Sequence, residues 1–193
     1  MDEPSPDEAG PQDRQELILD AVLRLLAEDG IAGVSIRSVA REAGVAHGLV
    51  GYYYEDKVAL IVAALRRIYE QDVAMVAPDP GRGAEERLRA ALRRVAAEEF
   101  LTKDYLTLRL QLWSLARVDG QFEQVNSEAQ RRYRRGLTEL IRAARPDLSR
   151  SQCDQRAADI SVVQNGLWLT ALIGIDRATI RRAVARCEEI ALG

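Results

Sequence analysis

Histidine is almost absent from this chain of 193 residues, which contains only His47. A Ser-His-Asp or Cys-His nucleophilic centre would have to include that one residue, and a multi-histidine metal centre is excluded. The two cysteines, Cys153 and Cys187, have neither the C-x-x-C spacing nor the density of a disulfide framework. We therefore expect no catalytic centre, no metal and no cofactor, and we expect the chain to work in the reducing cytoplasm.

Long apolar runs are missing as well. The longest uncharged stretch, residues 160–175, includes Ser161, Gln164 and Asn165, and it is too short and too polar to cross a bilayer core of about 30 Å. Residues 1–12 are rich in proline and acid, and they lack the basic start and apolar core of a secretion signal. The sequence thus predicts no membrane span, no export and a disordered tail over residues 1–12.

Strand-like alternation is not found, whereas apolar residues recur with the helical period almost throughout the chain. A hydrophobic content of 47% is enough for a full core in one compact body or two small lobes. We predict an all-α fold of about nine helices.

Capping residues predict the boundaries of the first helices. The first helix is expected to open at Asp13, which has a glutamate three residues later in capping-box spacing, and to stop at Gly30. Ser35 then caps a short helix. Gly44 makes a turn, and another short helix covers residues 46–53.

The remaining helices follow from stop signals. A fourth helix begins near Asp56 and ends in the proline- and glycine-rich segment 77–83, which marks the best boundary between two lobes. Caps and stops beyond this segment predict further helices over residues 84–101, 102–118, 121–145, 151–173 and 177–192.

The segment from Ser35 to Lys57 fits a helix-turn-helix, in which two short helices meet at a tight turn. Its apolar core would consist of Val39, Ala40, Ala43, Val45, Leu49 and Val50. The start of the second short helix would then face the major groove of double-stranded DNA, with Ala46, His47, Gly48, Gly51 and Tyr52 at base edges or sugars. Arg37 and Lys57 would meet phosphates.

Net charge does not support DNA binding by itself, because residues 13–75 contain seven basic side chains against ten acidic ones. Helix N-termini and a few well-placed donors would have to supply the phosphate contacts. Two alternatives remain open on residues alone: a helical turn without DNA function, and His47 as a plain surface residue.

The same segment resembles the signature of the TetR family, an A-G-V turn followed by a short recognition helix, an aromatic pair and a lysine. Two departures from the pattern are Ala46, in place of a hydroxylic helix cap, and Gly51, in place of a common tyrosine. The resemblance implies that Tyr53 and Lys57 contact phosphates and that Tyr54 packs inward. The matching positions are Ala43, Gly44, Val45, Gly48, Tyr53, Tyr54 and Lys57.

The second lobe resembles the BetI-type branch of that family at residues 112–117, 131–135 and 165–169. Its aromatic residues could line an effector pocket, or they could simply pack as core. The buried-looking polar residues Arg109, Gln164 and Asn165 need a partner, which could be a ligand or only a neighbouring carboxylate. The candidate effector residues are Phe100, Tyr105, Arg109, Trp113, Tyr133, Gln164, Asn165 and Trp168.

Surplus apolar surface on the last two helices suggests a homodimer formed by a four-helix interface. The candidate interface residues are Val162, Val163, Gly166, Leu167, Thr170, Ile180, Val184 and Cys187.

These features predict a DNA-binding domain at residues 13–56, a connecting helix at 57–77, and an effector-binding and dimerisation domain at 84–193. The expected function is transcriptional repression from a palindromic operator, relieved by an unidentified small-molecule effector. The rivals are an activator or constitutive regulator, and a helical small-molecule-binding protein or enzyme without DNA function.

Overall fold

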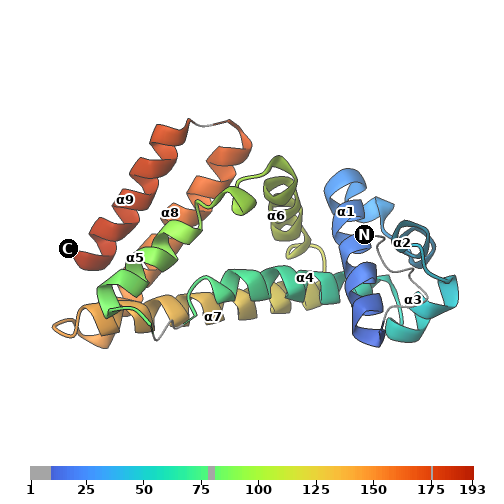
Figure 1. Cartoon of the computed structure of the whole chain (residues 1–193), viewed down its shortest axis with the longest axis horizontal. Coiled ribbons are helices and arrows are strands. Elements are labelled where there is room, and N and C mark those ends of the chain that lie inside the picture. Colours follow the sequence, from blue (N-terminus) through green and yellow to red (C-terminus); the bar gives the residue numbers. More distant parts are fainter. Residues whose placement is uncertain (1–9, 78–80, 175) are drawn as a thin grey trace. The chain divides into compact units, whose positions relative to one another are not determined.

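The computed structural model describes residues 10–77, 81–174 and 176–193. In these ranges the chain forms nine α-helices and one short 3₁₀ helix, with no strand, so the predicted all-α class is confirmed (Figure 1). No helix in the same ranges is long and apolar enough to span a membrane. Residues 1–9 of the predicted tail lie outside the described residues.

The helices group into two compact units. The first unit holds the chain up to Ile68 together with Gln111–Val125, and the second holds Tyr69–Leu110 and Asn126–Gly193. The helix predicted as a connector over residues 57–77 therefore contributes to both units. Residues 111–125, within the predicted second domain, group with the first unit.

The first unit is built on α1 (Pro11–Gly33), which begins two residues before the expected start. The N–H of Gly10 donates to the Asp13 carboxylate at 3.0 Å, so Asp13 serves the third helical position and not the cap. The predicted stop at Gly30 is found as an interruption of α1, because the backbone of Gly30 is not helical. Gly30 takes a φ of 66°, which kinks α1, and a last helical turn continues to Gly33.

The core of this unit combines α1 with α2 (Ile36–Ala43), α3 (His47–Tyr53) and the start of α4 (Lys57–Ala74). α2 packs on both α1 and α3. The side chains that become fully inaccessible are apolar and come from all four helices: Ile18, Ala21, Val22, Leu26, Val39, Val50, Leu60 and Ile61. This core fixes α2 and α3 as a rigid pair.

The second unit combines the end of α4 with α5 (Ala84–Arg94), α8 (Arg150–Leu172), α9 (Arg177–Leu192) and parts of α6 (Lys103–Leu115) and α7 (Gly120–Ala144). α8 and α9 form an antiparallel pair, and α5 packs on α9 (Figure 1). Its innermost side chains are Leu88, Leu92, Leu137, Ile141 and Ile160.

α5 is shorter than the helix predicted over residues 84–101. It ends at Arg94, and after a turn a 3₁₀ helix, η1 (Glu98–Phe100), follows. The carbonyl of Val95 accepts a hydrogen bond from the indole N–H of Trp168 at 2.9 Å, and the Val95 side chain is fully buried. A tertiary contact of this kind overrides local helical periodicity, which explains why the sequence pattern missed the break.

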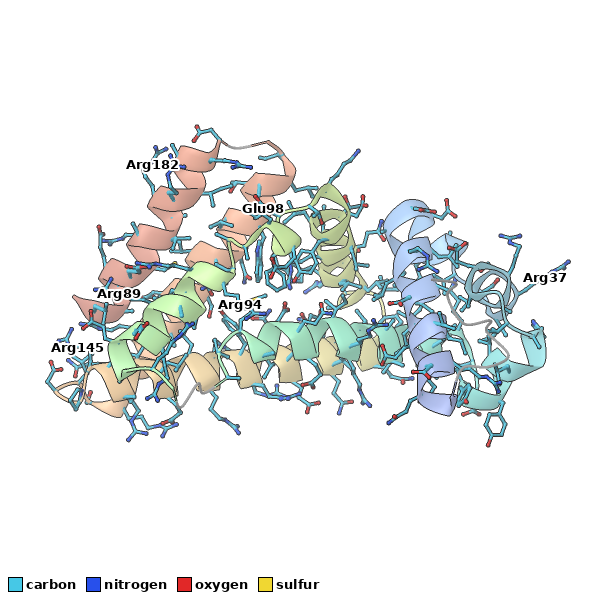
Figure 2. All side chains as sticks on the ribbon, in the orientation of Figure 1. Arg37, Arg89, Arg94, Glu98, Arg145 and Arg182 are labelled. Carbon is cyan, nitrogen blue, oxygen red and sulfur yellow. The ribbon has the colours of Figure 1, made fainter. Side chains whose placement is uncertain are left out.

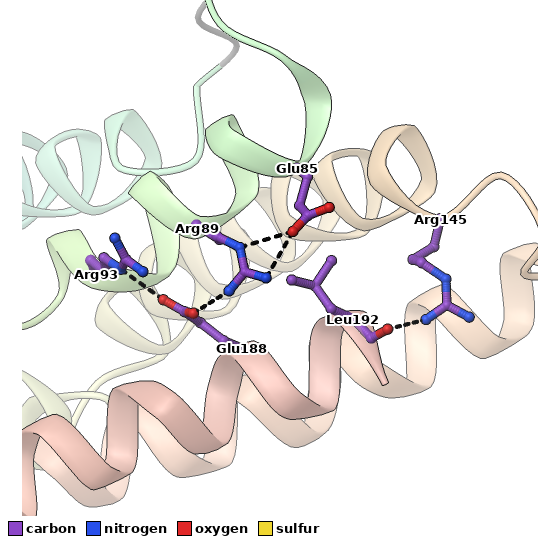
Figure 3. A network of polar contacts seen from close by, with 6 residues as sticks. All are labelled: Glu85, Arg89, Arg93, Arg145, Glu188 and Leu192. Carbon is purple, nitrogen blue, oxygen red and sulfur yellow. Dashed lines mark hydrogen bonds and ion pairs between the residues drawn. The ribbon is translucent and has the colours of Figure 1, made fainter.

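A polar network fixes α9 to its neighbours (Figure 3). Glu188 of α9 accepts hydrogen bonds from Arg89 at 2.5 Å and from Arg93 at 2.7 Å, both on α5. Arg145, directly after α7, donates to the carbonyl of Leu192. Burial raises the pKa of Glu188, but the hydrogen bonds from the two arginines outweigh it and hold the pKa below its ordinary value.

Candidate DNA interface and ligand cavity

α2 is held at its start by a reciprocal pair of serines. Ser35 Oγ accepts from the N–H of Ser38 at 3.0 Å, and Ser38 Oγ accepts from the N–H of Ser35 at 2.8 Å. The Ser38 hydroxyl also donates to the carbonyl of Gly33 at 2.7 Å, which joins α2 to the end of α1. The predicted cap at Ser35 is confirmed. Arg37, in the first turn of α2, is exposed and extends into solvent (Figure 2).

The turn between α2 and α3 depends on Gly44, whose φ of 67° and ψ of 26° lie in the left-handed region. The N–H of the next residue, Val45, bonds back to the carbonyl of Ala40 at 3.0 Å and closes the end of α2. Val39, Ala43 and Val50 are buried behind the turn. The predicted helix-turn-helix geometry is therefore present.

α3 exposes the residues expected to face DNA. Ala46 is the N-cap and makes no capping hydrogen bond through its side chain, as its lack of a hydroxyl requires. His47, Gly48 and Gly51 are exposed, and a Cβ added to either glycine would meet nothing within 4 Å. Neither glycine is therefore required by packing inside the protomer.

The three consecutive tyrosines take different environments. Tyr52 is 81% exposed, whereas Tyr53 and Tyr54 are half-buried. The rings of Tyr52 and Tyr53 meet edge to face, with centroids 5.3 Å apart. Burial, together with the nearby charge of Glu16, raises the pKa of Tyr54. The triplet therefore offers one fully exposed ring and not a continuous stacking platform.

Lys57, the first residue of α4, has a contact that the sequence did not predict. Its Nζ donates to the carbonyl of Ile31 at 2.5 Å, in the helical turn that follows the kink at Gly30. An ammonium has three donors, so this bond leaves others for a phosphate. The contact ties the start of α4 to the end of α1.

A small cavity lies inside the second unit. The space open to the centre of a water molecule is about 20 Å³, which is room for about one water. Polar and aromatic side chains from α4, α6, α7 and α8 line it: Tyr69, Asp72, Arg109, Ala129, Gln130, Tyr133, Ser161, Gln164, Asn165 and Trp168.

Arg109 is the central polar group of this cavity and is only 3% exposed. Its guanidinium forms an ion pair with Asp72 and donates to the hydroxyl of Tyr105 at 2.5 Å. Cζ of Arg109 lies 3.9 Å from the ring centroid of Trp168 and 5.1 Å from that of Tyr105. The charge of the arginine is therefore balanced by one carboxylate and covered by two aromatic rings.

Tyrosine hydroxyls complete the polar network as donors. Tyr105 donates to Asp72 at 3.0 Å, Tyr69 donates to Asn126 at 3.0 Å, and Tyr133 donates to Gln164 at 2.8 Å. Burial raises the pKa of Tyr69 to about 12, and burial also raises the pKa of Tyr105 and Tyr133. All three hydroxyls therefore keep their protons at neutral pH.

Most of the predicted effector residues meet at this cavity. Arg109, Tyr133, Gln164, Asn165 and Trp168 line it. Tyr105 contacts Arg109 and Asp72 beside it, and its ring packs edge to face against Phe100, with centroids 5.2 Å apart. Phe100 and Trp113 are not among the lining residues, and Trp113 belongs to the segment that groups with the first unit.

Asp72 and Tyr69 were missed by sequence reasoning, although a carboxylate partner for Arg109 was anticipated as one alternative. Asp72 continues the buried stripe of α4, because it follows the buried residues Leu65 and Ile68 by seven and four positions. An acid in register with an apolar stripe is the signal that could have found it.

The candidate dimer residues divide between core and surface. Leu167 and Cys187 are buried in the protomer's own core, at 3% and 1% exposure. An exposed stripe runs along α8 to its C-cap residue, with Val162 72%, Leu169 46% and the C-cap Ile173 76% exposed. Gly166 lies in the same register, and a Cβ there would meet nothing within 4 Å.

A short exposed helix after a glycine turn, followed in the chain by an all-helical unit with an internal polar cavity, defines a helix-turn-helix regulator. Residues 18–64 match the family described as bacterial regulatory proteins of the tetR family, and residues 84–191 match the C-terminal domain of BetI-type transcriptional repressors. The chain belongs to the TetR family, with a second domain of the BetI type. It is a DNA-binding transcriptional regulator, and the predicted family is confirmed.

Individual relatives agree with this assignment. The chain is 27% identical to the HTH-type transcriptional regulator BetI of Escherichia coli (strain K12) over 164 residues, 83% of each chain. A transcriptional regulator from Pseudomonas aeruginosa PAO1 superposes with a TM-score of 0.82 at 25% identity, over 96% of this chain and 91% of that one. A regulator from Saccharomonospora viridis, solved in complex with choline, has the same fold, with a TM-score of 0.70, 21% identity, and coverage of 92% and 95%.

Proposed function

We propose that this chain is a cytoplasmic, homodimeric repressor that leaves a palindromic operator when a small molecule binds in its second domain. α3 lies in the major groove in this proposal, and two copies read half-sites about one helical turn apart. Base edges and sugars are met by Ala46, His47, Gly48, Gly51 and Tyr52, and phosphates by Arg37, Tyr53 and Lys57.

The observation that carries the DNA proposal is the pair of open glycines in α3. Glycine costs about 1 kcal/mol relative to alanine in a helix interior, and here the helix has seven residues. Because Gly48 and Gly51 have open space where a Cβ would lie, no packing reason inside the protomer explains them. Close approach of a DNA groove to the α3 backbone explains both.

This proposal is tested by selecting bound fragments from a random duplex DNA pool at low and high salt, with wild-type protein and Gly48→Leu. The leucine fits the folded protomer but blocks the groove, so we expect a palindromic consensus for the wild type and none for the variant. The matched control is Gly120→Leu, since Gly120 is also exposed with open space around it. It should select the same consensus as the wild type.

Two results would contradict the proposal. The first is no enrichment by intact wild-type dimer at low salt, where phosphate contacts are strongest. That result favours the rival function, a helical small-molecule-binding protein or enzyme without DNA binding. The second is selection of the same consensus by Gly48→Leu, which would show that α3 does not lie in the groove.

We propose that the exposed stripe of α8 packs against the same stripe of a second copy of the chain and forms the dimer interface. Val162, Gly166, Leu169 and Ile173 are spaced by four, three and four residues, which places them on one helix face. An exposed apolar stripe in a soluble helical unit is typical of a two-fold interface. Val162→Asp is expected to give a monomer in sedimentation analysis and to weaken operator binding. The control, Val118→Asp, changes an equally exposed valine outside the stripe.

We propose that the effector enters the cavity around Arg109 and competes with its internal contacts. α4 supplies Asp72 to the cavity, and it begins with Lys57 in the first unit, so displacement of α4 offers a route to the DNA-binding end of the chain. The relative solved with choline supports testing small organic molecules as effectors. A ligand that binds the cavity and leaves operator affinity unchanged would refute the coupling.

A further inference from the structure

The surroundings of Arg109 have the composition of a cation site. The ring of Trp168 from α8 and the ring of Tyr105 from α6 cover the guanidinium, and the carboxylate of Asp72 from α4 balances it. Aromatic faces beside an acid are the usual way in which proteins hold organic cations such as quaternary ammonium groups. Here, a side chain of the protein itself occupies that position.

Burial stabilises the position of Arg109 beside Asp72. Arg109 is 3% exposed and Asp72 is 6% exposed, so each charge lies outside bulk water. Removing either partner would leave the other charge buried without compensation, which is far more costly than keeping the pair. A free cation entering the cavity would have to displace the guanidinium and leave it in the protein interior.

Gln164 offers an unused polar group to a ligand in this cavity. Gln164 is 2% exposed, and its Oε1 accepts from Tyr133. Among the described residues nothing accepts a hydrogen bond from its Nε2, although the residue lines the cavity. A buried donor without a partner is destabilising, so an oxygen acceptor on a ligand would be bound favourably there.

We propose that Arg109 is the resident cation of an aromatic cage and sets the specificity of the cavity. It excludes organic cations such as choline, and it leaves the cavity to small molecules that carry an oxygen acceptor for Gln164 and no positive charge. Because the cavity in this structure has room for about one water, a molecule larger than water enters only when the lining side chains move apart. That such a molecule acts as the effector rests on the proposed regulatory function, whereas the exclusion of cations rests on the cage alone.

The test compares choline with its uncharged isostere, in which carbon replaces the quaternary nitrogen. The two have nearly the same shape, so their relative affinity reports charge. Isothermal titration of the full-length wild-type protein should show the isostere binding at least as tightly as choline. Gln164→Leu should weaken the isostere by up to about tenfold, because the donor for its hydroxyl is lost.

Removing the resident cation should reverse the preference. In Arg109→Ala the space of the guanidinium becomes free while Asp72, Tyr105 and Trp168 remain, so choline is expected to bind at least about tenfold more tightly than the isostere. Arg109→Lys keeps a cation in the cage and should still exclude choline. Arg109→Ala/Asp72→Asn has no unpaired charge and should lose most of the preference for choline.

Folding of Arg109→Ala is followed by circular dichroism with and without each compound. If this variant needs a cation to fold, choline should restore its helix content and the isostere should not, which supports the cage equally. A variant that binds or folds no better with choline than with the isostere overturns the proposal. So does wild-type protein that prefers choline about tenfold.

None of these measurements includes DNA. Failure of the operator selection would refute the proposed regulatory function but not the exclusion of cations by Arg109. A wild-type protein that prefers choline would refute the exclusion of cations but not the proposed repressor function.

Discussion

The exposed face of α3 and the buried surroundings of Arg109 differ in how much open space they leave. Gly48 and Gly51 leave open space on the surface of α3, at a cost in helix stability. Arg109 and Asp72 instead fill their cavity down to room for about one water. The first unit therefore leaves space on its surface at α3, whereas the second unit fills its internal cavity with its own side chains.

The largest loss of stability is expected when the buried ion pair of Arg109 and Asp72 loses one partner. Asp72→Ala is expected to destabilise the second unit by about 3–5 kcal/mol, because Arg109 stays buried without its counter-charge. Urea unfolding followed by the fluorescence of Trp168, in a Trp113→Phe background, measures the loss. Arg109→Met/Asp72→Leu is the control, since it removes both charges and should cost much less. Equal losses in the two proteins would show that the buried charge does not matter.

A smaller effect should distinguish the glycine that the turn needs from the glycines that α3 leaves open. Gly44→Ala forces a Cβ into a φ of 67° and should cost roughly 1–2 kcal/mol. Gly51→Ala, in open space on a helix, should instead stabilise the first unit by about 0.5–1 kcal/mol. Hydrogen exchange of the α2 and α3 amides measures both. A loss of stability in Gly51→Ala would contradict the view that α3 is left open for a partner.

The cap of α3 offers a comparable gain. Ala46→Ser places a hydroxyl where it accepts a backbone N–H of the first turn, and it should stabilise α3 by about 0.5–1 kcal/mol. Ser35→Ala, at the cap that α2 already has, should lose about 1 kcal/mol. Thermal unfolding of the two variants gives both signs in one experiment. If Ala46→Ser gains nothing, the start of α3 is already satisfied by other means.

The arginine network of Figure 3 is partly exposed, whereas the ion pair of Arg109 and Asp72 is buried, so we expect the network to contribute less to stability. The folded-state pKa of Glu188 lies below its ordinary value of 4.5, so its stabilisation is complete above that value. It is lost as the pH falls through the lower folded pKa. Wild type and Glu188→Gln should therefore differ by up to about 1 kcal/mol near neutral pH and converge on acidification. Glu189→Gln, at an exposed pair with Arg186, should show almost no difference at either pH.

Sequence reasoning succeeded best for the segment from Ser35 to Lys57. The serine cap, the turn at Gly44 and the uncapped start of α3 were all predicted. Each depends on contacts within a few positions along the chain, so the residue types nearly determine the geometry. The sequence did not predict the helical turn that follows Gly30 in α1. It also did not predict that Lys57 donates a hydrogen bond to the carbonyl of Ile31 in that turn.

The cavity of the second unit was predicted only in part. Trp168, Gln164 and Arg109 were expected to lie together, and they do. Asp72 was missed, since it is separated from Arg109 by 37 positions along the chain. The sequence also did not predict which face of α8 is buried, because apolar residues occur almost all round that helix. The structure buries Leu167 and exposes Val162.

The all-α class and the helix-turn-helix follow from the sequence, because helical period, caps and turn glycines act over about four residues. The family was predicted from the resemblance of the segment from Ser35 to Lys57 to the TetR signature. Only the tertiary structure decided which charge balances Arg109, which rings cover it and which amide of the cavity lacks a partner. Those features depend on side chains from α4, α6, α7 and α8, and these side chains meet only when the helices pack around a common core.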